Sequence, residues 1–375
     1  MVSLPRALVI LVCAAAAVVV FAGVQAAAWL IAPAFLALII VIAVSPVASA
    51  LRRHGWPGWL TTLVLVVCVF GTMTLLAFGI IASVAALATQ LPQYADSADD
   101  LAASVTNWLA QFGVGPDQLK QAADSLDLSK LGGALAGLLS SIAGLASSLL
   151  FLLALLLFLS IEASGAGERL LSITVERPTA TRALERFATG TRQYLLVTTV
   201  FGCIVAVLDS IALAIMNVPL AIAWGLLAFI TNYIPNIGFL IGLVPPALLA
   251  LLSGGPDLMI AVVVVYCLLN FVLQSLVQPR FIGDAVGLSV TVTFVSLAFW
   301  AWLLGPLGAI LAIPLTLLVK AFLVDIDPRA KWADAFLRAS PKDFTEAELA
   351  AIAAERKARP RWRPLRRKPA EPAAV

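Results

Sequence analysis

Residues 59–89 of the chain read WLTTLVLVVCVFGTMTLLAFGIIASVAALAT, a stretch that contains no charged side chain. A helix needs about 20 apolar residues to cross the hydrocarbon core of a bilayer. This stretch is longer, so it predicts a membrane-spanning helix that tilts or projects beyond the bilayer. Backbone in lipid must satisfy its hydrogen bonds internally. The stretch therefore favours a helical integral membrane protein.

The composition of the whole chain agrees with this stretch. Of its 375 residues, 62% are hydrophobic and 12% are charged, whereas soluble domains contain about 25% charged residues. A soluble protein of this size could not hide so much apolar surface. The net charge of +3 is too small to indicate nucleic acid as a partner. Soluble enzymes, nucleic-acid binders, secreted disulfide scaffolds and disordered chains are therefore disfavoured.

Reactive residues are few, and they indicate neither a cofactor nor a metal. The sequence has no GxxxxGKS/T, HExxH or GxSxG run, so ATP-driven pumping, zinc proteolysis and serine hydrolysis lack their simplest signatures. The single histidine, His54, lies in a polar loop without neighbouring ligands. We predict that the chain is not an enzyme. We also expect its four cysteines to be buried thiols, because all lie in apolar runs: Cys13, Cys68, Cys203 and Cys267.

Apolar runs divide the chain into regions. The early runs are long, and the later runs are shorter and cut by Pro and Gly, which is typical of broken or re-entrant helices. The first run also resembles a signal peptide, but another apolar run follows at once, so we favour a retained helix. We expect transmembrane helices 1–3 at 1–89, an extracytoplasmic amphipathic segment at 90–136, a transmembrane core at 137–325 with a cytoplasmic helical loop at 162–192, and a cytoplasmic basic tail at 326–375.

The charges between the runs predict the orientation in a bacterial inner membrane. Cytoplasmic loops are enriched in Lys and Arg. The loop at 52–58, the segment at 162–192 and the tail are basic, whereas 90–136 holds six Asp against two Lys. We therefore place both termini in the cytoplasm. Ten crossings satisfy this arrangement, and so do eight crossings with one re-entrant hairpin.

Two segments outside the spans keep several interpretations. The outer segment at 90–136 has helical apolar spacing, which suits lying on the membrane, capping a cavity, contacting another subunit or packing on its own helices. The run at 359–368 contains six cations, which suit an anionic leaflet at about 1 kcal/mol per cation. Nucleic-acid binding is the weaker interpretation of this run, and a disordered topogenic tail is the simplest.

Asp209 lies deep within an apolar run, from Phe201 to Met216. A charge inside a membrane span is costly and is a functional hypothesis by default. The carboxylate would bind a proton or a sodium ion, or it would hydrogen-bond to a neighbouring helix. Arg280 and Asp284 form a second candidate, either a gating ion pair or an ordinary loop pair at a helix end.

Amide side chains form a third candidate. Asn270, Gln274 and Gln278 recur every four residues, so they share one helix face. Three amides on an apolar helix either line a polar path or hydrogen-bond helices together.

A break in a helix is expected at Ile234-Pro235, because proline removes a backbone donor. Asn232 and Asn236 bracket this dipeptide, and carbonyls freed there would suit a cation. Gly238 then begins a GxxxG run, which permits close contact between helices.

These stretches resemble the autoinducer-2 exporter family of bacterial membrane proteins. The resemblance covers most of 185–325 and implies about eight transmembrane helices, a cytoplasmic C-terminus, homo-oligomers and secondary transport. It also implies export of a signal such as autoinducer-2, or sodium/proton antiport. The motifs that carry it are NVP at 217–219, WGLL at 224–227, NYIPNIG at 232–238, PP at 245–246, QPRFIG at 278–283, VGL at 286–288, GPLGA at 305–309 and AIPL at 312–315.

One position departs from the family pattern. Members often carry an acidic residue a few positions before the proline that matches Pro279, but this chain reads Leu273-Gln274-Ser275 there. A cation site is therefore not carried over to that position, and Asp209 is the alternative source of negative charge.

We predict an all-α integral membrane secondary transporter that moves a small polar solute outward. A monovalent cation/proton antiporter is the alternative, and a non-transporting membrane scaffold is a further one. The expected partners are the lipid bilayer, a small polar solute, a proton or sodium ion and further copies of the chain; no cofactor is expected. The predicted pathway residues are Asp209, Asn232, Pro235, Asn236, Gly238, Asn270, Gln274, Gln278, Pro279, Arg280, Asp284, Gly305 and Pro306.

Overall fold

The computed structural model describes residues 5–94, 150–163, 165–235, 237–282 and 287–327, together with 330, 333, 336 and 337. The all-α membrane fold predicted from the sequence is confirmed. Five helices of the described residues are long and apolar enough to cross a membrane, or six if a pair bent by 56° counts as one span. Nearly all of the expected outer segment and of the basic tail lies outside the described residues.

The helices follow the predicted apolar runs. Their bounds are α1 (Arg6–Ala26), α2 (Ala28–Arg53), α3 (Gly58–Gln90), the short 3₁₀ turn η1 (Leu91–Tyr94), the helix Leu150–Ala163, α7 (Ala166–Glu176), α8 (Pro178–Ile215), α9 (Ala221–Thr231), α10 (Gly238–Asn270), the π-helical turn η2 (Phe271–Val277), α11 (Gln278–Ile282), α12 (Val290–Leu304), α13 (Pro306–Ile310), α14 (Ala312–Lys320) and the π-helical turn η4 (Ala321–Asp325).

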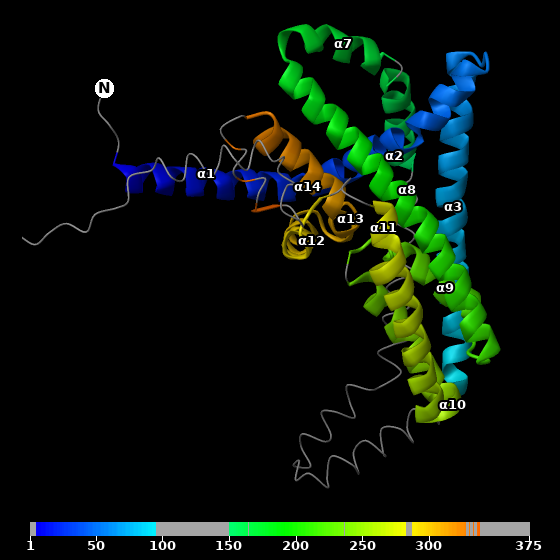
Figure 1. Cartoon of the computed structure of the whole chain (residues 1–375). Coiled ribbons are helices and arrows are strands. Elements are labelled where there is room, and N and C mark those ends of the chain that lie inside the picture. The colour runs from blue at the N-terminus through cyan, green and yellow to red at the C-terminus, as the bar shows by residue number, and fades with distance from the viewer. Residues whose placement is uncertain are drawn as a thin grey trace, which may run out of the picture.

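Helix α8 is the central support of the fold (Figure 1). Its 38 residues extend over about 57 Å. Towards its N-terminal end, Ala183, Phe187 and Tyr194 join a core cluster with α2 and with α12–α14. Towards its C-terminal end, Leu213 joins a second cluster with α9 and α10. Both parts of the Pro/Gly-rich second half are therefore positioned by one helix.

Helices α2 and α8 are joined by hydrogen bonds next to Pro46 of α2. Pro46 has no backbone N–H, so the carbonyl of Ile42 loses its helical donor. Ser45 Oγ donates to that carbonyl at 2.9 Å, and Arg192 Nε of α8 donates to it at 3.4 Å. Arg192 also donates to Ser45 Oγ at 2.7 Å. The guanidinium of Arg192 thus replaces part of the bonding that Pro46 removes.

The segment Gly238–Val277 folds back on itself, and we call it hairpin one. Gly238 packs against the carbonyl of Thr231, and Gln274 donates a hydrogen bond to Asn232 at 3.0 Å. In one straight helix, residues 238 and 274 would lie about 54 Å apart. Both contact the end of α9, so the chain must reverse between them. It does so at Gly255, where φ 79° and ψ −173° are open essentially only to glycine.

The segment Val290–Lys320 forms hairpin two. Gly305, with φ 72° and ψ −154°, repeats the backbone conformation of Gly255, and a proline follows both glycines. The two arms are joined by Trp300 Nε1, which donates to Thr316 Oγ1 at 3.1 Å. The two tips differ in polarity, because the tip of hairpin one continues into the exposed Asp257, whereas the tip of hairpin two continues into apolar residues.

Two helices of this half are too short to cross the bilayer. Helix α9 has 11 residues and α12 has 15, which correspond to about 16 and 22 Å. The hydrocarbon core is about 30 Å thick. Neither helix can therefore cross the hydrocarbon core by itself.

The prediction that the cysteines are buried is wrong. Cys13, Cys68, Cys203 and Cys267 are all exposed on the surface of the protein. The outer face of a membrane helix is apolar because it contacts lipid. An apolar run in such a protein therefore does not distinguish a core position from a lipid-facing one.

Candidate functional site

The break between α9 and α10 is held in place by α8. Ile234 N–H donates to Thr231 O at 2.8 Å, which turns the chain just before Pro235. Tyr194 of α8 donates its hydroxyl hydrogen to Tyr233 O at 3.4 Å. The Tyr233 hydroxyl lies 2.7 Å from Thr199 Oγ1, also on α8. Polar side chains of α8 therefore hydrogen-bond to the break, where the chain cannot form the regular hydrogen bonds of a helix.

A network of amide side chains joins the break to hairpin one. Asn232 Nδ2 donates to Thr198 O at 3.0 Å. Gln274 Nε2 donates to Asn232 Oδ1 at 3.0 Å and to Asn270 Oδ1 at 2.7 Å. Asn270 Nδ2 donates to Tyr266 O at 2.9 Å. We call Asn232, Gln274 and Asn270 the amide network; it connects α8, α9 and hairpin one.

Two features of the backbone make room for this network. Gly202 lies opposite Asn232, and a Cβ at that position would lie 3.0 Å from Asn232 Nδ2. Gln274 lies in the middle of the π-helical turn η2. This turn precedes Pro279, and Gln278 N–H donates to Leu273 O, five residues back. A π turn within an α-helix is frequently found at functional sites.

Asp209 is fully buried, at 0% exposure. Neither carboxylate oxygen has a hydrogen-bond partner among the described residues. Tyr266 of hairpin one lies within electrostatic range of Asp209, and its hydroxyl is likewise buried and unpartnered in this part of the chain. Helix α9 packs closely nearby, where a Cβ on Gly225 would collide with Ser210 and Ala206 of α8.

An unpartnered buried carboxylate is costly when it is ionised. The effective penalty is on the order of several kcal/mol for an ion in a protein interior. In a membrane protein such a group marks an ion or proton pathway by default. The arrangement at Asp209 can therefore bind a proton, or a cation whose charge compensates the carboxylate.

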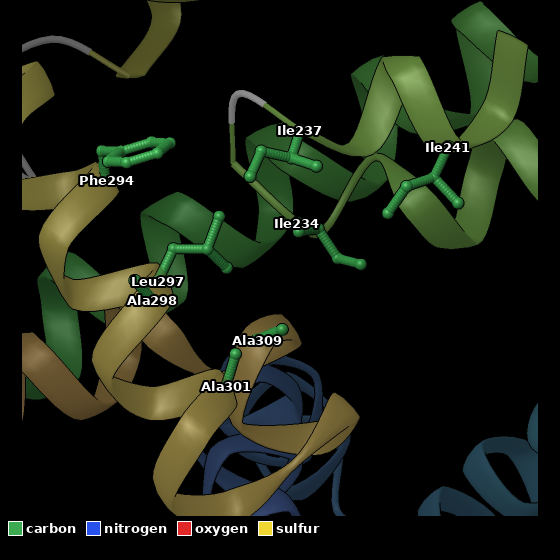
Figure 2. Close-up of a pocket in the computed structure, with 8 residues that line it drawn as sticks. All are labelled: Ile234, Ile237, Ile241, Phe294, Leu297, Ala298, Ala301 and Ala309. Carbon is green, nitrogen blue, oxygen red and sulfur yellow. The ribbon is translucent and has the colours of Figure 1, made fainter. Parts of the chain in front are cut away.

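A cavity of about 230 Å³ lies where the break meets hairpin two. Figure 2 shows its lining residues, which come from the break, from α10, from α12 and from α13. It lies next to the break at Gly305-Pro306 that we placed in the polar pathway, yet its walls are apolar. They are formed by Ile234, Ile237, Ile241, Phe294, Leu297, Ala298, Ala301 and Ala309.

The predicted site residues separate into three groups. Asn232, Asn270 and Gln274 meet in the amide network. Asp209 lies on α8, the helix whose Thr198 carbonyl accepts the hydrogen bond from Asn232. Pro235 and Gly238 shape the break beside them. Gly305 and Pro306 form the tip of hairpin two, where Trp302 O accepts a hydrogen bond from Gln25 of α1 at 3.3 Å.

The remaining predicted residues do not join this site. Gln278 makes no hydrogen bond to the amide network within the described ranges, and Arg280 is exposed on α11, where Pro279 also lies. Asn236 and Asp284 lie outside the described residues, so the predicted ion pair of Arg280 with Asp284 stays a prediction.

Sequence reasoning missed three residues that matter here. Tyr266 lies four positions before Asn270 on the same helix face, a spacing that could have revealed it. Thr198 and Tyr194 contribute through α8, and no local spacing connects them to the break. In the part of the chain that the structure describes, no three His, Cys, Asp or Glu residues come together as metal ligands.

Known proteins resemble this chain over most of its length. Residues 8–327 match the family described as AI-2E family transporter. The AI-2 transport protein TqsA of Escherichia coli is 31% identical over 306 residues, covering 81% of this chain and 88% of that protein. A putative transport protein of Haemophilus influenzae is 31% identical over 326 residues, or 85% and 93% of the two chains. The putative transport protein YhhT of Escherichia coli is 29% identical over 311 residues, or 82% and 88%.

Proposed function

We propose that this chain, which belongs to the AI-2E transporter family, is an ion-coupled secondary transporter that exports a small polar organic solute. Family membership and the apolar helices make it a multi-pass membrane transporter. The names of its relatives point to transport and not to an enzyme. The inner membrane with both termini in the cytoplasm, and assembly into homo-oligomers, belong to the proposal.

The observation that carries ion coupling is the unpartnered carboxylate of Asp209. It lies within a helix that can cross a membrane, and nothing in the described residues neutralises it. Binding a proton or a sodium ion removes the charge, so it changes the free energy of any conformation in which Asp209 is buried. A transporter couples two fluxes through such a difference between conformations.

The solute class follows from the side chains at the break. Amides, two tyrosines and threonines offer both donors and acceptors at the end of α9, which suits a small solute with hydroxyl or carbonyl groups. One relative is named as an AI-2 transport protein, so autoinducer-2 is the first solute to test. The apolar cavity between the break and hairpin two has no groups to bind such a solute.

The test is solute flux in proteoliposomes under imposed proton and sodium gradients, with a small panel of polar solutes that includes autoinducer-2. We expect one gradient to accelerate export by the full chain, and Asp209→Asn to remove that acceleration. Full coupling in Asp209→Asn would overturn the role of Asp209. Flux that ignores both gradients would overturn ion coupling.

The same carboxylate also suits sodium/proton antiport, the second candidate. Proton release driven by a sodium gradient, in vesicles free of organic solute, would favour it. A non-transporting scaffold predicts instead that substitutions at Asn232, Pro235 and Gly238 are silent while deletion of the basic tail is not.

A further inference from the structure

Buried polar groups without partners concentrate on one strip of the molecule. Among the described residues, six buried side-chain nitrogen or oxygen atoms lack a hydrogen-bond partner. Five of them belong to Thr191, Thr198, Asp209 and Tyr266. Each such atom costs about 1–3 kcal/mol if it stays unsatisfied, and a native structure that retains it calls for an explanation.

These groups form a row and not a cluster. Thr191, Thr198 and Asp209 are 7 and 11 residues apart, close to whole turns of an α-helix, so they lie on one face of α8. The row is about 27 Å long. A bound cation needs several oxygens that converge on one point. An extended row of hydroxyls ending in a carboxylate instead suits a chain of water molecules that carries a proton.

The amide network bridges the widest gap in this row. Thr198 and Asp209 are separated by about 16 Å along α8. Beside that gap, Asn232 is bonded to Thr198 O, and Gln274 links it to Asn270. Asn270 is bonded to the carbonyl of Tyr266, and the Tyr266 hydroxyl lies within electrostatic range of Asp209. Polar groups therefore line the row between Thr198 and Asp209, where the amides can hydrogen-bond to water molecules but do not relay a proton themselves.

Other titratable groups lie near the row on α8 itself, at the break and on hairpin one. Tyr194 of α8 interacts with the side chain of Thr198, Tyr233 of the break contacts the neighbouring Thr199, and Tyr266 of hairpin one lies within electrostatic range of Asp209. Arg192 is next to Thr191 in sequence but points to Ser45 of α2. The tyrosine hydroxyls already carry a proton at neutral pH, whereas the ionised carboxylate of Asp209 can accept one, so Asp209 is the end point for a proton among these groups.

We propose that this strip is the route by which protons reach Asp209 from the Pro178 end of α8. The inference rests on the proposed function of Asp209. At each step a water or hydroxyl oxygen accepts one proton and releases another to the next oxygen. The last transfer forms one O–H bond on the Asp209 carboxylate, and no other reactant is required. By the topology inferred from the charges, this route opens to the cytoplasm.

The test compares the rate of proton uptake with its end point in proteoliposomes of the full chain. The probe is the proton, driven by an imposed membrane potential and followed with a pH dye in the lumen. Infrared absorbance of the protonated carboxyl, assigned by subtracting Asp209→Asn, reports how far Asp209 is protonated at equilibrium. We expect Thr198→Val and Tyr266→Phe to slow uptake at least tenfold without changing the equilibrium band.

Two controls separate the hydroxyl from packing. Thr198→Ser keeps the hydroxyl and should restore the rate of the natural chain. Thr72→Val removes an exposed hydroxyl of α3 that donates to Cys68 O at 2.8 Å within its own helix, and should leave the rate unchanged. A Thr198→Val rate equal to that of the natural chain would overturn the route while leaving Asp209 in place. A loss confined to sodium flux would overturn the proton assignment. Unchanged flux in Asp209→Asn would overturn both proposals.

Discussion

The amide network and the carboxylate of Asp209 are both polar groups packed against or within α8, but they differ in hydrogen bonding. Each amide of the network is bonded to a carbonyl or to another amide. The carboxylate of Asp209 has no partner in the described residues. The bonds between the amides fix the local structure and use only part of their capacity to donate and accept, whereas the carboxylate of Asp209 makes no such bond within the described ranges. The network therefore holds the break, and Asp209 remains free to change its charge.

The largest expected effect is on stability, at the centre of the network. Gln274→Leu removes two hydrogen bonds and leaves two acceptors unpaired, one on the buried Asn270 and one on the half-buried Asn232, so unfolding should become easier by about 2–3 kcal/mol. Gln278→Leu is the matched control, because Gln278 does not bond to the network in the described residues. Thermal unfolding in detergent measures both. Equal stability of the two variants would contradict the structural role of the network.

A somewhat smaller effect is expected where the network meets α8. Gly202→Ala places a methyl group 3.0 Å from Asn232 Nδ2, and such overpacking costs about 1–3 kcal/mol. Gly71→Ala is the control on α3, where nothing lies within 4 Å of the added Cβ. The same thermal assay applies. A Gly202→Ala protein as stable as Gly71→Ala would show that Asn232 can move without loss.

Asp209→Leu should have the opposite effect to the amide variants, because it should not lower stability. Removing a buried carboxyl that has no partner should leave stability unchanged or raise it by about 1–2 kcal/mol, while gradient-driven flux is lost. Unfolding and flux are measured on the same preparation. A clear loss of stability would mean that Asp209 has a structural partner after all.

The smallest effect is expected at the edge of the break. Thr199→Val removes the hydroxyl that lies 2.7 Å from the Tyr233 hydroxyl, and one such hydrogen bond contributes about 1 kcal/mol. Thr72→Val provides the reference for a threonine that bonds only within its own helix. If the two variants unfold alike, the hydroxyl pair does not hold the break.

Local spacing predicted much of this architecture. The uncharged run at 59–89 became α3, and Ile234-Pro235 became the break after α9. The four-residue interval placed Asn270 and Gln274 together, as the bond between them requires. Gln278 has the same four-residue spacing, but the π turn before it adds a residue to the helical turn, so its side chain no longer shares the face of Asn270 and Gln274.

Local spacing could not predict contacts between residues that are far apart in the sequence. Asn232 and Gln274 are bonded although 42 residues separate them, and only the reversal at Gly255 brings them together. Burial also failed as a prediction for the cysteines, because lipid makes the outside of the protein as apolar as its core. In a membrane chain, hydropathy locates the helices, while rare polar residues carry the information on how they meet.

The tips of the two hairpins impose different demands on biogenesis. The tip of hairpin one carries Asp257, and placing its carboxylate at the centre of a bilayer costs about 2.5–3.5 kcal/mol. The Gly305-Pro306 tip of hairpin two carries no charge and meets no such barrier. Burying the tip of hairpin one in lipid during insertion therefore costs more than burying the tip of hairpin two.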